Sequence, residues 1–189
     1  MRLINNHLRI VFFVVFILIM PFSRGIFAQQ PSYAFGVNAG LSSFQSLSNS
    51  LTGIELSVYY EFPAWFSKAF NFQASLFYLR ETEFFLPQSG NGQYYPYFYG
   101  ATFSGIMRQK LSGSFFLEEQ AGLLYMKNYF FSNYNQSNYG VNLGIAGGLD
   151  LRGNSLSGFL LSIGYKGGLT FNGDTPSFNS FFVQAHYIL

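Results

Sequence analysis

Few side chains in this sequence could take part in chemistry. Beyond residue 28 it contains one histidine, His186, and eight carboxylates, and it contains no cysteine at all. The absence of cysteine excludes disulfides and every mechanism that depends on a thiol nucleophile or a thiolate metal ligand. With one histidine and no cluster of residues at ligand spacing, the sequence gives no sign of a metal site or of a bound cofactor.

Five titratable residues are the remaining candidates for a site. They are Glu61, Arg108, Glu118, Asp150 and His186, and each lies toward one end of a segment in which apolar and polar residues alternate. A period of two is that of a β-strand, because successive side chains of a strand point to opposite faces. Strands are therefore the elements expected to position these residues.

Eight segments alternate in this way. They span residues 33–42, 54–62, 70–79, 97–108, 115–126, 140–151, 159–166 and 180–189. Each has one largely apolar face, yet no apolar run beyond residue 28 is long enough for a transmembrane helix. A closed sheet in lipid requires this combination, whereas a soluble β-sandwich would turn its polar face outward. The sequence therefore predicts an all-β fold, an eight-stranded antiparallel up-and-down transmembrane β-barrel.

Two of the segments allow a second interpretation. In the fifth, either register leaves Glu118 or Glu119 on the lipid side. We place Glu118 inside and Glu119 near the membrane edge, where a charge costs only ~0–1 kcal/mol. In the sixth, glycines spaced by four match the helix-packing pattern G-x-x-x-G. Each glycine would cost a helix ~1 kcal/mol, whereas a strand uses them as small inward residues.

The inward residues sort into two groups along the expected barrel axis. The five titratable residues lie toward the end that carries the chain termini. An apolar group lies toward the other end, with Glu55 and Lys166 near the rim: Phe77, Leu79, Phe98, Leu124 and Phe182. Eight strands leave an interior that side chains fill, and charges in such a lumen must pair. We expect a structural network of ion pairs, and proton or ion gating is the alternative.

Residues 1–28 have the pattern of a secretory signal peptide. Basic residues precede an apolar run at 10–20, which Pro21 ends, and Ala28 suits signal peptidase. The run has 11 residues, against the ~20 that a spanning helix needs, so a retained anchor is the poorer alternative. The predicted barrel domain is 29–189.

The charge of the barrel domain argues against nucleic-acid binding. Three of the ten Lys and Arg residues lie within the signal peptide, which leaves seven against eight carboxylates and a net charge of −1. Nucleic-acid binding would require a clustered basic surface.

The connections between the expected strands alternate in length. Short ones lie at 63–68, 109–114 and 152–157, and longer ones at 43–53, 80–96, 127–139 and 167–176. Outer-membrane barrels have short periplasmic turns and longer external loops, with both termini periplasmic. Aromatic residues also gather near the strand ends, as in interfacial girdles: Phe62, Trp65 and Phe66 at one rim and Tyr97, Tyr99, Tyr125 and Tyr165 at the other.

The C-terminal segment resembles the closing strand of bacterial outer-membrane barrels. In those proteins the last residue is aromatic and an aromatic or apolar residue stands two before it; Tyr187 fits this pattern and Leu189 departs from it. By strand count and loop asymmetry the chain resembles the small barrels of the OmpX, OmpA transmembrane-domain and opacity-protein type, and the barrel-domain proteins of Bacteroidetes. The resemblance implies export to the Gram-negative outer membrane, contact with its lipid, and assembly by the machinery that recognises the last strand.

The resemblance also bears on function. Enzymes on this fold act on lipids through a Ser/His pair with an acid at the external end, whereas His186 is expected at the opposite end. We therefore expect no enzyme, but a structural or surface-interaction protein that binds a protein or surface ligand through external loops. The Tyr- and Asn-rich stretch 127–139 suits recognition, or it merely covers the barrel mouth. The alternatives are a binding or transfer barrel for a small hydrophobic ligand or lipid and, third, a lipid-modifying enzyme. The sequence names neither the ligand nor the oligomeric state.

Overall fold

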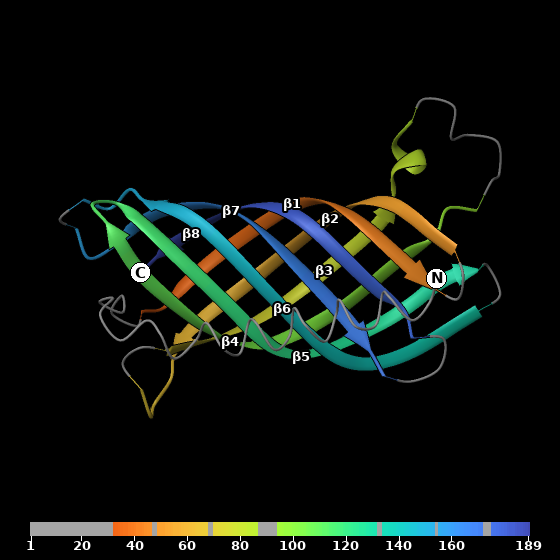
Figure 1. The fold of residues 1–189 in the computed structure, drawn as a ribbon, viewed down its shortest axis with the longest axis horizontal. Coiled ribbons are helices and arrows are strands. Elements are labelled where there is room, and N and C mark those ends of the chain that lie inside the picture. Colours follow the sequence, from red (N-terminus) through yellow and green to blue (C-terminus); the bar gives the residue numbers. More distant parts are fainter. Residues whose placement is uncertain are drawn as a thin grey trace.

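A computed structural model describes residues 32–46, 49–67, 70–86, 94–131, 134–153, 155–171 and 175–189. Its strands are β1 (Ala34–Ser46), β2 (Asn49–Pro63), β3 (Phe70–Glu81), β4 (Tyr97–Ser112), β5 (Phe115–Phe131), β6 (Tyr134–Asp150), β7 (Gly158–Thr170) and β8 (Ser177–Ile188). Each strand pairs antiparallel with the next, and β1 pairs with β8, which closes the barrel (Figure 1). The predicted eight-stranded up-and-down barrel is confirmed.

The predicted signal peptide, with its expected cleavage after Ala28, lies outside the described residues. No helix in the described part of the chain is long and apolar enough to cross a membrane. A short 3-10 helix, η2 (Thr82–Phe85), begins the connection between β3 and β4.

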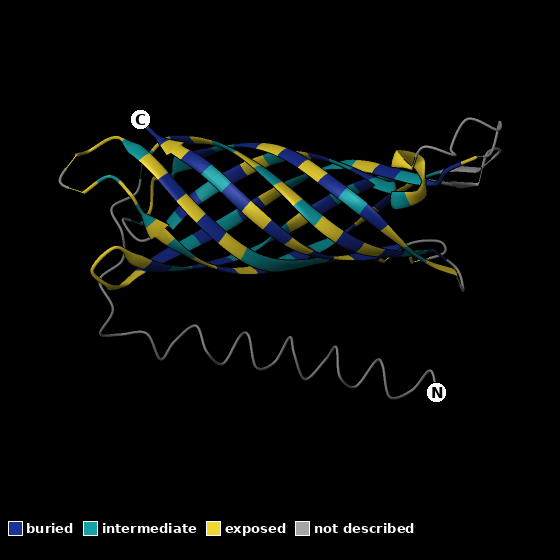
Figure 2. Cartoon of the chain, turned by 90° about the horizontal axis from the view of Figure 1, so that it is seen from above, coloured by how far each residue is buried: buried dark blue, intermediate teal, exposed yellow. Residues whose placement is uncertain are grey.

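Buried and exposed residues alternate along every strand, and in Figure 2 they form stripes around the barrel. Large apolar side chains cover the outer surface: Phe35, Val37, Leu41, Leu56, Val58, Leu76, Phe103, Leu123, Ile145, Leu161, Ile163, Phe181 and Val183. Ile163 and Phe181 are 68% and 70% exposed. A continuous apolar belt around a closed sheet is suited to lipid, because the ladder satisfies every backbone group internally.

The two ends of the barrel differ. We call the end with the β2–β3, β4–β5 and β6–β7 connections the turn end; both Tyr33 and Leu189 lie there, joined by a hydrogen bond of 2.9 Å between their backbones. The opposite end is the loop end. At the turn end, the β4–β5 connection is tight, and Gly113 takes a φ of +54°, which an L side chain would adopt only with strain.

The predicted long loops at 43–53 and 127–139 are wrong. Strands β1 and β2 continue to Ser46 and from Asn49, and β5 and β6 continue to Phe131 and from Tyr134. Beyond the belt these stretches are rich in Ser, Asn and Tyr, so the alternation that marks a strand in the sequence is lost while backbone pairing continues. The result is a β5–β6 hairpin that projects from the loop end (Figure 1).

Candidate functional site

Arg108 lies at the centre of a buried charge network in the half of the lumen near the turn end. It stands opposite Glu118 in the β4–β5 register, and its Nε donates to Glu118 Oε2 at 2.9 Å. Its Nη2 donates to both carboxylate oxygens of Glu61 on β2, at 3.2 Å each. Glu61 is fully buried, and Glu118 and Arg108 are 3% and 5% exposed. One guanidinium therefore joins two carboxylates that come from different sides of the lumen.

Amide side chains satisfy the remaining carboxylate lone pairs. Asn71 and Gln73 on β3 donate to Glu61 at 3.4 and 3.5 Å. Gln184 on β8 donates to Glu118 Oε1 at 3.3 Å. A buried ion pair is stable only when such additional hydrogen bonds offset the loss of water.

His186 joins the network as a neutral acceptor. Its Nδ1 lies 2.8 Å from the Tyr59 hydroxyl and 3.2 Å from the Gln184 amide nitrogen. That amide nitrogen can only donate, and its second contact with the Glu118 carboxylate fixes the orientation of the amide. The Nδ1 atom therefore accepts, and the ring proton lies on Nε2. The 3.7 Å separation between Nδ1 and Glu61 is accordingly not an ion pair.

Gly36 on β1 provides the space for this contact. A Cβ at this position would overlap the Tyr59 ring and lie 2.7 Å from the Cβ of His186. The small inward residue thus lets the tyrosine reach across to the histidine.

Apolar side chains close the network toward the turn end. A cluster that we call the floor consists of Ala34, Phe116, Leu160 and Ile188, and all four are buried. Phe116 and Ile188 occupy the next inward positions beyond Glu118 and His186, and the Phe116 and His186 rings lie 6.3 Å apart. The floor separates the charges from water at the turn end.

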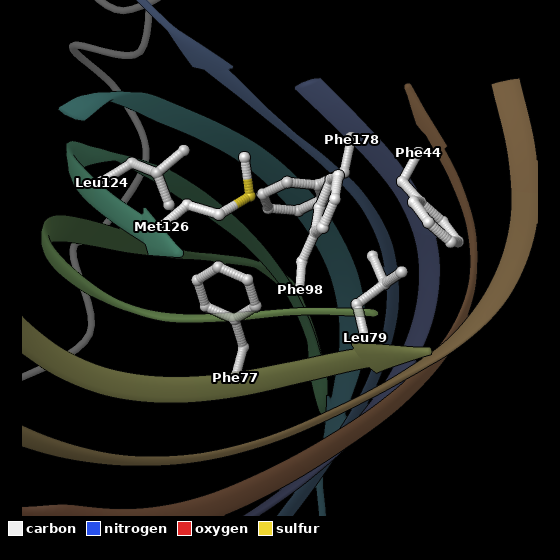
Figure 3. Packing of buried hydrophobic residues seen from close by; sticks show 7 residues of the cluster. All are labelled: Phe44, Phe77, Leu79, Phe98, Leu124, Met126 and Phe178. Atoms are coloured by element: carbon white, nitrogen blue, oxygen red, sulfur yellow. The ribbon is translucent and has the colours of Figure 1, made fainter. Parts of the chain in front are cut away.

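A larger apolar cluster, the plug, fills the lumen near the loop end (Figure 3). Its buried members are Phe44, Phe77, Leu79, Phe98, Leu124, Met126 and Phe178. Four of the five predicted apolar lumen residues belong to it. The fifth, Phe182, is buried as well, but the Lys166 Nζ lies 5.3 Å from its ring centroid.

Asp150 is paired with Arg152 and not with Arg108. Asp150 lies at the rim of the turn end, where Arg152 donates three hydrogen bonds to it, one from its backbone N–H at 3.1 Å and two from its guanidinium at 2.9 and 2.7 Å. The reason is local: Arg152 follows it by two residues and reaches it without entering the lumen. The predicted grouping of Asp150 with Arg108 is therefore corrected.

A second ion pair lies deeper in the lumen than expected. Lys166 Nζ and Glu55 Oε1 are 2.5 Å apart, and Glu55 is fully buried rather than at the rim. Asn38 and Ser42 on β1 contribute further hydrogen bonds, to Lys166 and Glu55 respectively. Strands that extend past the belt place these residues near the middle of the barrel.

The structure also brings together a set of ligand-type side chains that the sequence spacing did not reveal. Glu61, Glu118 and His186 each offer a ligand atom, all within 4.8 Å of one another. Two carboxylates and an imidazole can bind zinc. Arg108, however, already donates to both carboxylates, so a metal ion would have to displace the guanidinium.

Sequence reasoning missed Tyr59, Asn71, Gln73 and Gln184 as members of the network. The alternation along each strand shows that all four side chains point inward. Their positions along the barrel axis, however, are set by the register between neighbouring strands, and this register decides which side chains come into contact. In this network the charges neutralise one another, and the side chains fill the lumen. Among the described residues, the hydrogen-bond partners of His186 are Tyr59 and Gln184.

The closed barrel, with its apolar belt and filled lumen, has the fold of small eight-stranded outer-membrane β-barrels. The structure is similar to Neisserial surface protein A, with a TM-score of 0.63 and 10% sequence identity, over 85% of this chain and 100% of that one. It is also similar to Ail, the attachment invasion locus protein of Yersinia pestis, solved in complex with the heparin analogue sucrose octasulfate. The TM-score is 0.57 and the identity 12%, again over 85% and 100% of the two chains. No protein-family model matches the chain, and no curated protein does either.

Replacing Tyr59 with phenylalanine should lower the free energy of unfolding by about 1 kcal/mol, because the buried hydrogen bond from its hydroxyl to His186 is lost. The Gln184 amide still donates to Nδ1 of His186 in this variant. Urea unfolding in lipid vesicles measures the change. The matched control is Tyr60→Phe, since Tyr60 is the next residue and faces outward. Equal losses in the two variants would contradict the assigned contact.

Proposed function

We propose that this protein is a non-enzymatic barrel of the Gram-negative outer membrane that presents an interaction surface outside the cell. In this proposal the signal peptide 1–28 is removed on export, the assembly machinery recognises β8, and the loop end faces outward. The belt and the filled lumen support membrane insertion without a transport or catalytic role. The similarity to Ail supports a surface role, since that protein is named for attachment and invasion.

The observation that carries the interaction role is the projecting β5–β6 hairpin. Strand β6 pairs with β7 only from Gly140 onward, and Phe171 donates to the carbonyl of Tyr139 at 3.0 Å. In the ladder of the described residues, β6 already pairs with β5 from Tyr134, so the hairpin extends past the start of the β6–β7 ladder. It carries exposed side chains such as Ser137 and Tyr139 beyond the rim of the barrel, where serine and tyrosine supply contact area and hydrogen bonds to a partner at low entropic cost.

Labelling of a single cysteine tests the location and the orientation, because the natural chain has no cysteine. The Ser137→Cys side chain, exposed on the hairpin, should react with a bulky polyethylene-glycol maleimide on intact cells. The control is Ser157→Cys, exposed at the turn end, which should react only after the outer membrane is permeabilised. The reverse pattern would contradict the orientation.

The same pair of variants tests the interaction role. A maleimide–benzophenone attached at position 137 should crosslink a partner on the cell surface, and the same reagent at position 157 should not. If position 137 is labelled from outside but yields no crosslinked species, the hairpin has no partner and the protein is structural.

A further inference from the structure

Outward-facing side chains of β3, β4 and β5 form an aromatic patch with a cation at each side, at the loop end of the barrel. We call it the collar patch, and it consists of Arg80, Tyr97, Tyr99, Lys127 and Tyr129. The three tyrosines stack: the ring centroids of Tyr97 and Tyr129 are 4.8 Å apart with the planes at 6°, and those of Tyr99 and Tyr129 are 5.7 Å apart. The patch therefore presents a continuous aromatic surface.

A cation flanks this surface on either side. The guanidinium of Arg80 lies 3.3 Å from the ring centroid of Phe84 in η2 and 5.6 Å from that of Tyr97, and it donates to the Tyr78 hydroxyl at 3.0 Å. Lys127 Nζ lies 5.6 Å from the ring centroid of Tyr129. The aromatic contacts hold both cations along the outer wall.

Neither cation is neutralised by a carboxylate in the described part of the chain, where the cations that form ion pairs are Arg108, Arg152 and Lys166. The acidic residue next to Arg80, Glu81, stands opposite Gly53 and takes the inward register. Glu83 lies in η2, outside the strands. Two cations without carboxylates beside them on the outer face suit an anionic ligand.

The height of the patch identifies the kind of ligand. Tyr99 is followed two residues later by Ala101 and then by Phe103, which belongs to the apolar belt. Tyrosines directly above such a belt lie at the level of the lipid headgroups. Arg80 and Lys127 are two strands and two residues apart, which places their Cα atoms ~12 Å from each other by strand geometry. That separation suits two phosphates of one large headgroup rather than a single small anion.

We propose that the collar patch binds a phosphate-bearing glycolipid headgroup of the outer leaflet, with Arg80 and Lys127 on its phosphates and the tyrosine faces against its sugars. Cations bind phosphate through charge-assisted hydrogen bonds, and aromatic faces supply contact area with little loss of entropy. The inference rests on the proposed orientation, in which the loop end lies at the outer leaflet.

Native mass spectrometry of the whole folded barrel in phosphatidylcholine nanodiscs tests the proposal. The probes are bis-phosphorylated lipid A, the same lipid with both phosphates removed, and phosphatidylglycerol. We expect the natural protein to retain the bis-phosphorylated lipid. The double variant Arg80→Gln/Lys127→Gln should bind it at least tenfold more weakly, because two charged contacts are lost. The control Lys110→Gln removes an exposed cation at the turn end and should leave binding unchanged.

Equal retention of the dephosphorylated lipid, or of phosphatidylglycerol, would overturn the assignment of a phosphorylated glycolipid. Unchanged binding by the double variant would overturn the assignment of the two cations. Because the barrel is accessible from both sides in a nanodisc, the result does not depend on its orientation in the cell. Failure here is thus distinct from failure of the cysteine labelling.

Discussion

Replacing Arg108 with methionine should lower the free energy of unfolding of the barrel by roughly 3–5 kcal/mol, as expected when one partner of a buried ion pair is removed. The substitution would leave Glu61 and Glu118 buried without their shared counter-charge. The floor excludes water from one side of these carboxylates and the plug closes the lumen at the far end. The loss of stability should therefore be that expected for a buried ion pair that water does not reach.

Urea unfolding in lipid vesicles, followed through the fluorescence of the single tryptophan, Trp65, measures this loss. The triple variant Arg108→Met/Glu61→Gln/Glu118→Gln should regain most of it, because glutamine keeps the volume and removes the charge. Arg152→Met is the matched control, since the Arg152–Asp150 pair lies at the water-accessible rim, and it should cost about 1 kcal/mol or less. An Arg108→Met protein as stable as the natural one would show that water reaches the carboxylates.

Replacing Phe98 with alanine should cost roughly 3–5 kcal/mol, the usual effect of emptying a buried phenylalanine site. Phe98 has no exposed surface and meets Phe44 edge to face, with the ring centroids 5.0 Å apart. The strands around the plug are hydrogen-bonded into a closed barrel, so they cannot move inward to fill the cavity. The loss of stability should therefore lie in the upper part of the ~3–5 kcal/mol range.

The same unfolding measurement tests this prediction, with Phe103→Ala as control. Phe103 lies on the same strand, but it faces outward and is 46% exposed, so lipid can fill the space that its ring leaves. Phe103→Ala should therefore lower the free energy of unfolding by much less than Phe98→Ala does.

In planar bilayers the natural protein should show no steady conductance, because side chains fill the lumen. Large, stable conductance steps from a monomer would contradict a filled lumen.

Alternation along the chain was sufficient to predict the barrel and, for most side chains within the eight predicted segments, the face on which they lie. Successive side chains of a strand point to opposite faces, so once the apolar residues are assigned to the outer face, the residues between them must point inward. This assignment requires no knowledge of the partner strand. Arg108, Glu118 and His186 could be placed in the lumen for this reason. The position of a side chain along the barrel axis could not be predicted in this way, because it depends on the register between neighbouring strands. A single sequence does not contain that information.

The errors at the site follow from this limit. Asp150 has the inward register, but the Arg152 that reaches it comes from the connection after β6, where alternation carries no information. Phe44 and Phe178 were missed because β1 and β8 continue past the ends that their apolar faces suggested. The hairpin was interpreted as a loop for the same reason, since its residues no longer contact lipid.

The arrangement of the charge network also determines how the barrel can form. Its members come from β2, β4, β5 and β8, so before β1 joins β8 no run of neighbouring strands shorter than β2–β8 contains the whole set. A partly assembled sheet in the bilayer would hold Arg108 and its carboxylates against hydrocarbon, at a cost of several kcal/mol for each unsatisfied group. Intermediates with an open seam are therefore unfavourable, and joining β1 to β8 becomes an all-or-none step.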